Sequence, residues 1–464
     1  MGASGKNGAN ERKPPPRVLR RNSSLMRPAL ERHGSLAPFV TRQPSNGPPP
    51  PNDGLSQLLL TASAAAVVSA LSTASLFLAW VQRLRPPRLY YFPSAANRAM
   101  VMAMPLLMRS YVPNLLSWNA HAAGFFGYVK LPGKKPHSRE RVTMPDGGTI
   151  CLSWSSSVVP GAPIILLLPG INNDSSMPYV RHVMALLQKE GCGHACCVDW
   201  RGLGEAGELT GTTCTPRPYC AACASDVGAI LTHLKIKYPG SPLYAVGWSL
   251  GGGLLLSHMG EAGDACPLSG AMAVSPLVDF EANYHHMLSG ESLITPFYLP
   301  LIMAPLIAYL FRHRRALSTG DQPMSWFRDV PAALLRGKYG MDELFGKLWG
   351  HETAASYHKA GSATHVLDKI RVRTLIVHSE DDPICPVSAL PLERMAQNPN
   401  LVTAITKHGG HMGYTAGISP LAGTWTDRVL VHYLRHLSSG AVEGAEEASA
   451  TNEASPAVWI ASKL

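Results

Sequence analysis

The amino-acid sequence predicts an α/β protein built around a mostly parallel central sheet. Three observations lead to this fold class. Short, mostly apolar segments recur over residues 163–406, segments with helical spacing separate the first of them, and glycines end those helical segments. Continuous apolar runs of this length are typical of strands that are buried on both faces. Their alternation with helices indicates a parallel sheet that helices cover on both sides.

The expected elements follow one another from residue 141. Residues 141–154 predict two strands joined by a turn at Asp146-Gly147-Gly148. The central strands are expected at residues 163–168, 194–200, 242–248, 271–277, 373–379 and 401–406. Helices are expected over 179–190, 219–238 and 425–437, and the first two end before Gly191 and Gly240.

The chain is long enough for a large core, and its basic excess is unevenly placed. It has 464 residues, of which 46% are hydrophobic, and a formal net charge of +10. Residues 1–54 form an Arg-, Pro- and Ser-rich tail with few apolar residues, which predicts disorder. Because no basic stripe is interleaved with stacking aromatics, we expect contact with anionic membrane surfaces and no binding of nucleic acid.

Residues 58–81 predict an N-terminal transmembrane helix. These 24 residues carry no charge, and at roughly 1.5 Å per residue they span a hydrocarbon core of about 30 Å. Arg83, Arg85 and Arg88 follow closely, so the positive-inside rule places the rest of the chain in the cytosol. The Ala, Ser and Thr content of the span leaves a cleaved signal anchor or a buried core helix as alternatives.

A juxtamembrane segment is expected between this helix and the folded domain, over residues 82–110. Its apolar run at 102–108 suits either the membrane interface or an arm that docks on the core. The folded domain is expected over residues 111–437.

Two further segments interrupt or follow the domain. Residues 281–364 separate two expected strands and predict an inserted lid. Their segment 293–311 is apolar but broken by prolines, which favours a lid over a second membrane span. Residues 438–464 are expected to be flexible, and their final Ser462-Lys463-Leu464 matches a peroxisomal address.

Ser249 is the candidate nucleophile. It lies in Gly247-Trp248-Ser249-Leu250-Gly251, directly after an expected buried strand and before a run of small residues that opens a helix. A sharp strand-to-helix turn presents such a serine and leaves no room for side chains two positions away, which explains both glycines. The pentapeptide alone is a weak signal, and its strand and helix context makes it specific.

A serine hydroxyl needs a base and an acid to become nucleophilic at neutral pH. Asp381 and Asp382 follow the strand at 373–379, at the sheet edge where ligand sites of open α/β sheets form. His411 follows the strand at 401–406, between glycines that let a loop place its imidazole over the serine. His408 competes with it, and we interpret His408 as structural because it lies nearer the end of the strand.

Acyl transfer also needs two backbone N–H donors for the developing oxyanion. Leu250, immediately after the serine, is expected to supply one. The loop after the first central strand is expected to supply the other, from Ile171. Asn173-Asp174-Ser175 in this loop is also a glycosylation sequon, but its place beside the candidate site argues against modification.

The nine cysteines are scattered through expected strands and helices, which favours a reducing compartment over a disulfide framework. Cys220 and Cys223 form a CxxC motif, and Cys196-Cys197 lie nearby in sequence. A metal site would need a second pair at ligand spacing, whereas Cys196-Cys197 lie within an expected buried strand. We therefore interpret these thiols as core residues and expect no metal and no cofactor.

Five sequence blocks in order resemble the type-4 subfamily of the AB hydrolase superfamily, a group of membrane-anchored serine hydrolases that includes phospholipases and acylglycerol or short-chain ester hydrolases. The blocks are LLLPGINNDSSMPYV, DWRGLGEA, AVGWSLGG, SEDDPICP and KHGGHMGY, and the resemblance covers residues 111–437. It implies an α/β-hydrolase fold, one N-terminal anchor and a triad of Ser249, Asp382 and His411. The spacing from Asp382 to Pro386 resembles other members and favours Asp382 over Asp381.

The chain departs from the family pattern at two places. Ile171-Asn172-Asn173 stands where members usually have a Leu-Thr-Gly type of sequence, and Trp248 stands where Phe is common. Neither change removes a catalytic side chain. The different residues at 171–173 are expected to affect which substrate sizes fit and the detail of the oxyanion hole.

These observations predict a membrane-anchored hydrolase that cleaves carboxylic esters of lipids through an acyl-enzyme intermediate. Its expected partners are a lipid ester substrate, namely a phospholipid, an acylglycerol or a shorter ester, and the membrane itself. An acyltransferase that uses an alcohol in place of water is the first alternative. A noncatalytic membrane scaffold is the second, and the complete set of three candidate side chains argues against it.

Overall fold

Helix α1 (Gly54–Val81) contains the segment for which the sequence predicts a transmembrane helix. The computed structural model describes residues 54–81, 84–117, 119–207, 209, 217–288, 295–319, 326–439 and 459–460, and the chain divides into two units, Met1–Leu71 and Ser72–Leu464. None of the helices in these residues is both long enough and apolar enough to cross a membrane, so the predicted span is not confirmed. The predictions for the remaining residues of both tails lie outside the described residues.

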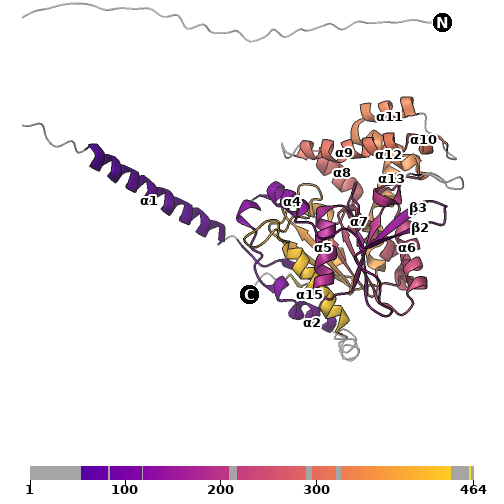
Figure 1. Cartoon of the computed structure of the whole chain (residues 1–464), viewed down its shortest axis with the longest axis horizontal. Coiled ribbons are helices and arrows are strands. Elements are labelled where there is room, and N and C mark those ends of the chain that lie inside the picture. Colours follow the sequence, from indigo (N-terminus) through magenta and orange to yellow (C-terminus); the bar gives the residue numbers. More distant parts are fainter. Residues whose placement is uncertain are drawn as a thin grey trace, which may run out of the picture. The chain divides into compact units, whose positions relative to one another are not determined.

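Within the described residues, ten strands form one sheet in the order β10-β1-β9-β8-β7-β6-β4-β5-β3-β2 (Figure 1). The six strands from β9 to β5 in this order run parallel, and their residues are almost all buried. They are β4 (Ile164–Leu168), β5 (His194–Asp199), β6 (Leu243–Trp248), β7 (Gly270–Val274), β8 (Thr374–Ser379) and β9 (Leu401–Thr406). The mostly parallel sheet predicted from the apolar segments is confirmed.

Antiparallel strands flank the parallel centre on both sides. Strands β2 (Ser138–Thr143) and β3 (Thr149–Trp154) form the expected hairpin. At the other edge β1 (Arg88–Tyr91) pairs with β9, and β10 (Trp459–Ile460) pairs with β1. The sheet therefore begins before the domain start predicted at residue 111 and includes part of the expected tail, because strands this short give no periodic signal.

The segment after β1 docks on the core. Helices α2 (Ala95–Ala103) and α3 (Pro105–Met108) bury Val101 and Leu107 in one of the two main hydrophobic clusters, and Met104 between the helices is buried there too. Of the two interpretations of residues 102–108, the structure therefore shows the docked arm.

Two helical layers cover the faces of the sheet. Helices α6 (Ala224–Lys237) and α7 (Leu250–Ala262) pack in one cluster, while α5 (Pro178–Lys189) and α15 (Trp425–Ser438) pack in the other (Figure 1). Strand β4 shows the division residue by residue, since Ile164, Leu166 and Leu168 join the first cluster and Ile165 and Leu167 the second. This alternation is the period of two that a strand imposes.

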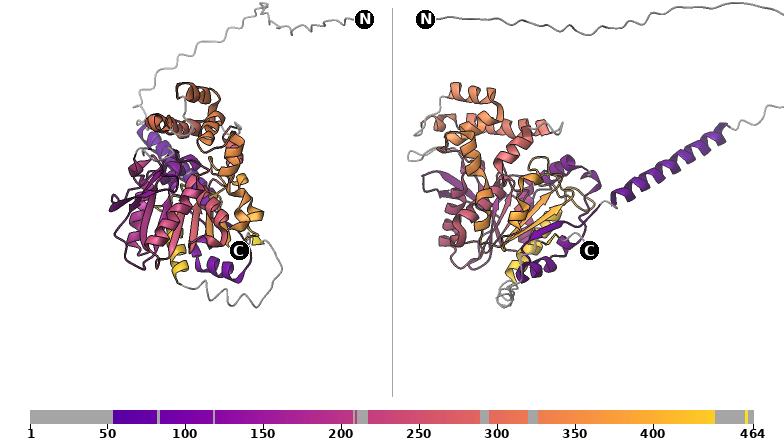
Figure 2. Two further views of the ribbon diagram at one scale, coloured as in Figure 1. Left: turned by 90° about the vertical axis from the view of Figure 1, so that its right-hand side faces the viewer. Right: turned by 180° about the vertical axis from the view of Figure 1, so that it is seen from behind.

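The connection from β7 to β8 holds a group of helices at one end of the sheet (Figure 2). They are α8 (Phe280–Leu288), α9 (Thr295–Arg312), α10 (Arg314–Leu317), α11 (Trp326–Leu335), α12 (Gly337–Lys347) and α13 (Ala354–Gly361). Helix α9 continues through Pro300 and Pro305, although prolines remove backbone hydrogen bonds. Its buried residues, among them Leu306 and Leu310, pack on the core and stabilise it there.

Candidate active site

Ser249 lies at the turn between strand β6 and helix α7. Its backbone has φ 52° and ψ −119°, a conformation that residues with a side chain rarely adopt. A Cβ atom on Gly247 would lie 2.6 Å from the backbone oxygen of Gly251, and one on Gly251 would lie 2.1 Å from the backbone oxygen of Leu168. Both distances are too short for any side chain, so this turn requires glycine at both positions.

Three loops at the same edge of the sheet bring Ser249, Asp382 and His411 together. They follow the parallel strands β6, β8 and β9, whose carboxyl ends meet at this edge. Nε2 of His411 lies 2.9 Å from Oγ of Ser249, and Nδ1 of His411 lies 2.9 Å from Oδ2 of Asp382. With Nδ1–H donating to the carboxylate, Nε2 is placed to accept the proton of the serine hydroxyl.

The surroundings of Asp382 fix its carboxylate and keep it ionised. The side chain has no exposed surface, and Oδ1 accepts hydrogen bonds from the N–H groups of Ile384 and Cys385 at 2.9 and 2.8 Å. Burial acts to raise the pKa of Asp382, but attraction to His411 outweighs it and lowers the pKa. For His411, burial acts to lower the pKa, but the carboxylate of Asp382 and the thiol of Cys385 together raise the pKa. His411 is therefore a stronger base than free imidazole.

The two alternative residues, Asp381 and His408, contact each other instead of the serine. Nδ1 of His408 lies 3.3 Å from Oδ2 of Asp381, and Oδ1 of Asp381 accepts a hydrogen bond of 2.8 Å from the N–H of Gly410. Gly410 directly precedes His411. This second acid–histidine pair therefore supports the loop that carries His411.

Ile171 and Leu250, the expected oxyanion donors, both line the cavity at Ser249. In the part of the chain that the structure describes, the backbone N–H groups of Ile171 and Leu250 have no hydrogen-bond partner. For Leu250 this is expected, because the first N–H groups of a helix have no partner within the helix. The loop residue Asn172 adopts φ 59° and its side chain donates to the backbone oxygen of Ile302 on α9 at 3.2 Å. Asn172, which belongs to the segment that departs from the family pattern, thus links this loop to the inserted helices.

The cavity that opens at Ser249 is mainly apolar. Helices α8, α9 and α12 of the insertion form much of its wall, opposite the loop at Ile171. Apolar residues from these helices that line it are Phe280, Met287, Ile302, Met303, Leu306 and Phe345. The amide of Asn283 and the carboxylate of Asp342 are polar exceptions.

Helix α4 (Ala120–Tyr128) supports the loop of His411 in a way that the sequence reasoning missed. A Cβ atom on Gly127 would lie 2.5 Å from Cα of Gly413, and one on Gly124 would lie 3.3 Å from the backbone oxygen of His411. The helix therefore packs backbone to backbone on the loop. The two glycines three residues apart were the available signal, but nothing in the sequence said which segment they would face.

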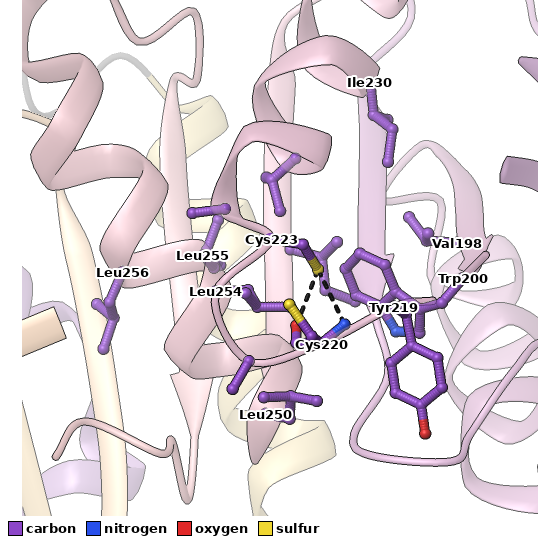
Figure 3. Packing of buried hydrophobic residues seen from close by; sticks show 14 of the residues in the cluster. Val198, Trp200, Tyr219, Cys220, Cys223, Ile230, Leu250, Leu254, Leu255 and Leu256 are labelled. Carbon is purple, nitrogen blue, oxygen red and sulfur yellow. Dashed lines mark hydrogen bonds between the residues drawn. The ribbon is translucent and has the colours of Figure 1, made fainter. Parts of the chain in front are cut away.

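Cys220 and Cys223 are core residues, as expected. Helix α6 begins at Ala224 and not near residue 219, because these two cysteines form a turn in which Sγ of Cys223 donates to the backbone oxygen of Cys220 at 2.8 Å. Figure 3 shows both thiols packed among Tyr219, Leu250 and Leu254. The described residues contain no cluster of three or more His, Cys, Asp or Glu side chains that could hold a metal ion.

Asn173, the asparagine of the sequon, is buried and accepts a hydrogen bond of 2.7 Å from the hydroxyl of Tyr128. Its amide is therefore closed to glycosylation in the folded chain. The hydrogen bond also joins the candidate oxyanion loop to helix α4.

Three comparisons relate the chain to known proteins. The profile of the family described as serine aminopeptidase, S33, matches residues 161–412, more than half of the chain. Phospholipase ABHD3 of Mus musculus is 28% identical over 367 residues, covering 76% of this chain and 84% of the relative. Monoacylglycerol lipase ABHD2 of Bos taurus is 28% identical over 374 residues, covering 75% and 85%. The solved structure of the Pyrococcus furiosus esterase Pf2001 is similar with a TM-score of 0.41 and 14% identity, covering 67% of this chain and 97% of the esterase.

Proposed function

This chain belongs to the family described as serine aminopeptidase, S33, within the α/β-hydrolase superfamily, and we propose that it hydrolyses carboxylic esters of lipids. The observation that carries the proposal is the chain of contacts from Asp382 through His411 to Ser249, which opens into an apolar cavity. The names of the relatives, a phospholipase and a monoacylglycerol lipase, support lipid esters over peptides.

The proposed reaction proceeds through an acyl-enzyme. Oγ of Ser249 attacks the ester carbonyl while Nε2 of His411 takes the hydroxyl proton, and Asp382 stabilises the imidazolium that forms. The N–H groups of Ile171 and Leu250 stabilise the negative charge on the carbonyl oxygen. His411 then gives its proton to the leaving alcohol, and a water molecule that His411 activates releases the acyl group from Ser249.

The inserted helices act as a lid in this proposal. Helix α9 supplies Ile302, Met303 and Leu306 to the cavity wall, and it contacts α4 through a hydrogen bond of 2.7 Å between Tyr298 and His121. Apolar side chains on η1 (Leu115–Ser117), α4 and α9 are more than half exposed, namely Leu115, Leu116, Phe125 and Leu301. Such exposed apolar residues suit contact with the surface of a membrane or micelle that presents the substrate.

A fluorophosphonate probe tests whether Ser249 is activated. The purified chain is expected to gain one covalent adduct, which peptide mass spectrometry places on Ser249, and Ser249→Ala is expected to gain none. Ser257→Ala is the matched control, because Ser257 is a buried serine in the same helix α7 and should leave labelling intact. Absence of an adduct on a folded wild-type chain would exclude the enzyme and favour the noncatalytic scaffold.

Replacing Gly127 with alanine is expected to lower kcat/KM for a nitrophenyl ester by about 100-fold, because the new Cβ must push the loop of His411 out of position. Gly240→Ala is the control, since a Cβ there would meet nothing within 4 Å. Thermal unfolding of both variants separates a displaced loop from a loss of the fold. Unchanged kcat/KM in Gly127→Ala would show that the packing of α4 does not position His411.

A further inference from the structure

The loop after β4 carries three successive backbone N–H groups, and two tyrosine hydroxyls hold the outer two. The N–H of Gly170 donates to the hydroxyl of Tyr179 at 3.2 Å. The N–H of Asn172 donates to the hydroxyl of Tyr219 at 3.1 Å. The N–H of Ile171, between them, has no partner among the described residues. This pattern leaves Ile171 as the donor that the loop can offer to an oxyanion.

The side chain of Asn172 holds the backbone directly after Ile171. The hydroxyl of Tyr219, which accepts from the N–H of Asn172, also donates to Oδ1 of the same residue. Nδ2 of Asn172 donates to the backbone oxygen of Ile302 on α9 at 3.2 Å. A carbonyl oxygen can only accept, so the amide has to present Nδ2 to Ile302 and Oδ1 to the hydroxyl. Both ends of the amide therefore fix one orientation of the side chain.

The backbone conformation of Asn172 needs such support. Its φ of 59° lies in the left-handed region, which asparagine adopts more readily than most residues but still at a cost in free energy. A backbone of this kind persists only where the surrounding contacts enforce it. The hydrogen bonds with Tyr219 and Ile302 supply these contacts on the side of the loop that follows Ile171.

Tyr219 is itself held firmly in place. Its side chain is buried, and its ring packs edge-on against the ring of Tyr309 on α9, with the centroids 5.2 Å apart. The hydroxyl of Tyr309 donates in turn to the backbone oxygen of Arg201 at 2.9 Å. Burial raises the pKa of Tyr219, so its hydroxyl keeps the proton that it donates to Asn172. The core and the inserted helices thus both contribute to the support of Asn172.

We propose that Asn172 and Tyr219 are positioning residues that direct the N–H of Ile171 towards the oxyanion. A Cβ atom on Gly170 would lie 3.4 Å from Cβ of Ser249, so the loop passes directly beside the nucleophile. A donor stabilises the oxyanion only at close range, so a loosened loop weakens binding of the transition state more than binding of the substrate. The inference rests on the proposed function, because it concerns the oxyanion hole of that reaction.

Two substitutions remove these contacts without straining the backbone. Asn172→Gly keeps the left-handed conformation, which glycine adopts readily, and removes both contacts of the side chain. Tyr219→Phe keeps the packed ring and removes the hydroxyl. Each is expected to lower kcat for a nitrophenyl ester by about 30-fold, less than the roughly 10²–10³-fold loss that follows removal of an oxyanion donor. KM is expected to change by no more than about threefold.

Inhibition by an alkyl trifluoromethyl ketone measures the oxyanion hole directly. Oγ of Ser249 bonds to the carbonyl carbon, its proton passes to His411, and the carbonyl oxygen becomes an oxyanion without loss of a leaving group. The inhibition constant is expected to rise in both variants by about the factor by which kcat/KM falls, because the adduct resembles the transition state. Thermal unfolding of each variant shows whether the fold is retained.

Asn400→Gly and Tyr433→Phe are the matched controls. The side-chain amide of Asn400 donates to the backbone oxygen of Ile370 at 3.3 Å. The hydroxyl of the buried Tyr433 donates to the backbone oxygen of Arg373 at 3.0 Å. Neither residue lines the cavity at Ser249. Both variants lose a contact of the same kind and are expected to keep the wild-type kcat and inhibition constant.

The outcomes separate the inference from the proposed function. A wild-type kcat and inhibition constant in Asn172→Gly or in Tyr219→Phe would overturn the inference and leave the proposed function in place. A loss confined to KM would also overturn it, since the residue would then act on the bound substrate and not on the donor. A wild-type chain that neither hydrolyses the ester nor binds the ketone would overturn the proposed function, and the inference with it.

Discussion

Replacing His411 with alanine is expected to lower kcat for ester hydrolysis by about 10⁶-fold, the magnitude seen when a hydrolase of this kind loses its base. Nε2 of His411 lies 2.9 Å from Oγ of Ser249 and is placed to remove its proton. Without that base the hydroxyl stays protonated at neutral pH and attacks the ester slowly. Steady-state hydrolysis of a nitrophenyl ester measures the loss.

His408→Ala is the control for this prediction. His408 is the other histidine of the same loop, but its ring contacts Asp381 and is about one third exposed. We expect its removal to change kcat by no more than about threefold, because a surface contact of this type contributes little. Equal losses in the two variants would show that the loop as a whole, and not the base, carries the activity.

Replacing Asp382 with asparagine is expected to lower kcat by about 10⁴-fold, because the amide no longer holds His411 in the tautomer that accepts the serine proton. Both oxygens of the carboxylate lie within 3.1 Å of Nδ1 of His411. Asp381→Asn is the matched control, since it alters the neighbouring carboxylate and keeps an oxygen that can accept from Gly410. A larger loss in Asp381→Asn than in Asp382→Asn would reverse the two assignments.

The dependence of kcat/KM on pH gives a second measure of the same contact. His411 acts as a base only when neutral, so activity falls as pH drops through its pKa. Burial lowers this pKa, but Asp382 and Cys385 together raise it, so the acid limb of the wild-type profile is expected above pH 6.5, the ordinary value of histidine. Asp382→Asn removes the raising influence and is expected to move the limb to lower pH. A limb that stays in place would show that Asp382 does not act on His411.

The central sheet was predictable because its strands are mostly apolar runs. β4, β6 and β9 match their expected segments within one residue. β1 and β10 were missed, since strands of four and two residues owe their pairing to the sheet edge and not to a local pattern. The prolines of α9 argued against a continuous helix. The helix is continuous because its packing on the core outweighs this local preference.

The candidate site was likewise predictable only in part. Ser249 and His411 carry local signals in their flanking glycines, and the structure places both where those signals indicate. Asp381 and Asp382 are adjacent, so residue type could not separate them. The resemblance to the family favoured Asp382, and in the structure Asp382 is the one that contacts His411. Gly127 acts through contacts with a loop that is distant in sequence, and no local pattern reveals such contacts.

The inserted helices leave the sheet from β7 and return to it at β8, and these two strands pair as parallel neighbours. Because the strands are parallel, the connection leaves at the carboxyl end of β7 and returns at the amino end of β8, so the sheet fixes its two ends at opposite edges. Lengthening a segment between fixed ends adds little entropic cost. The insertion is thus a suitable unit for exchange between relatives, since replacing it changes the cavity wall that α8, α9 and α12 supply and leaves the serine, histidine and aspartate in place.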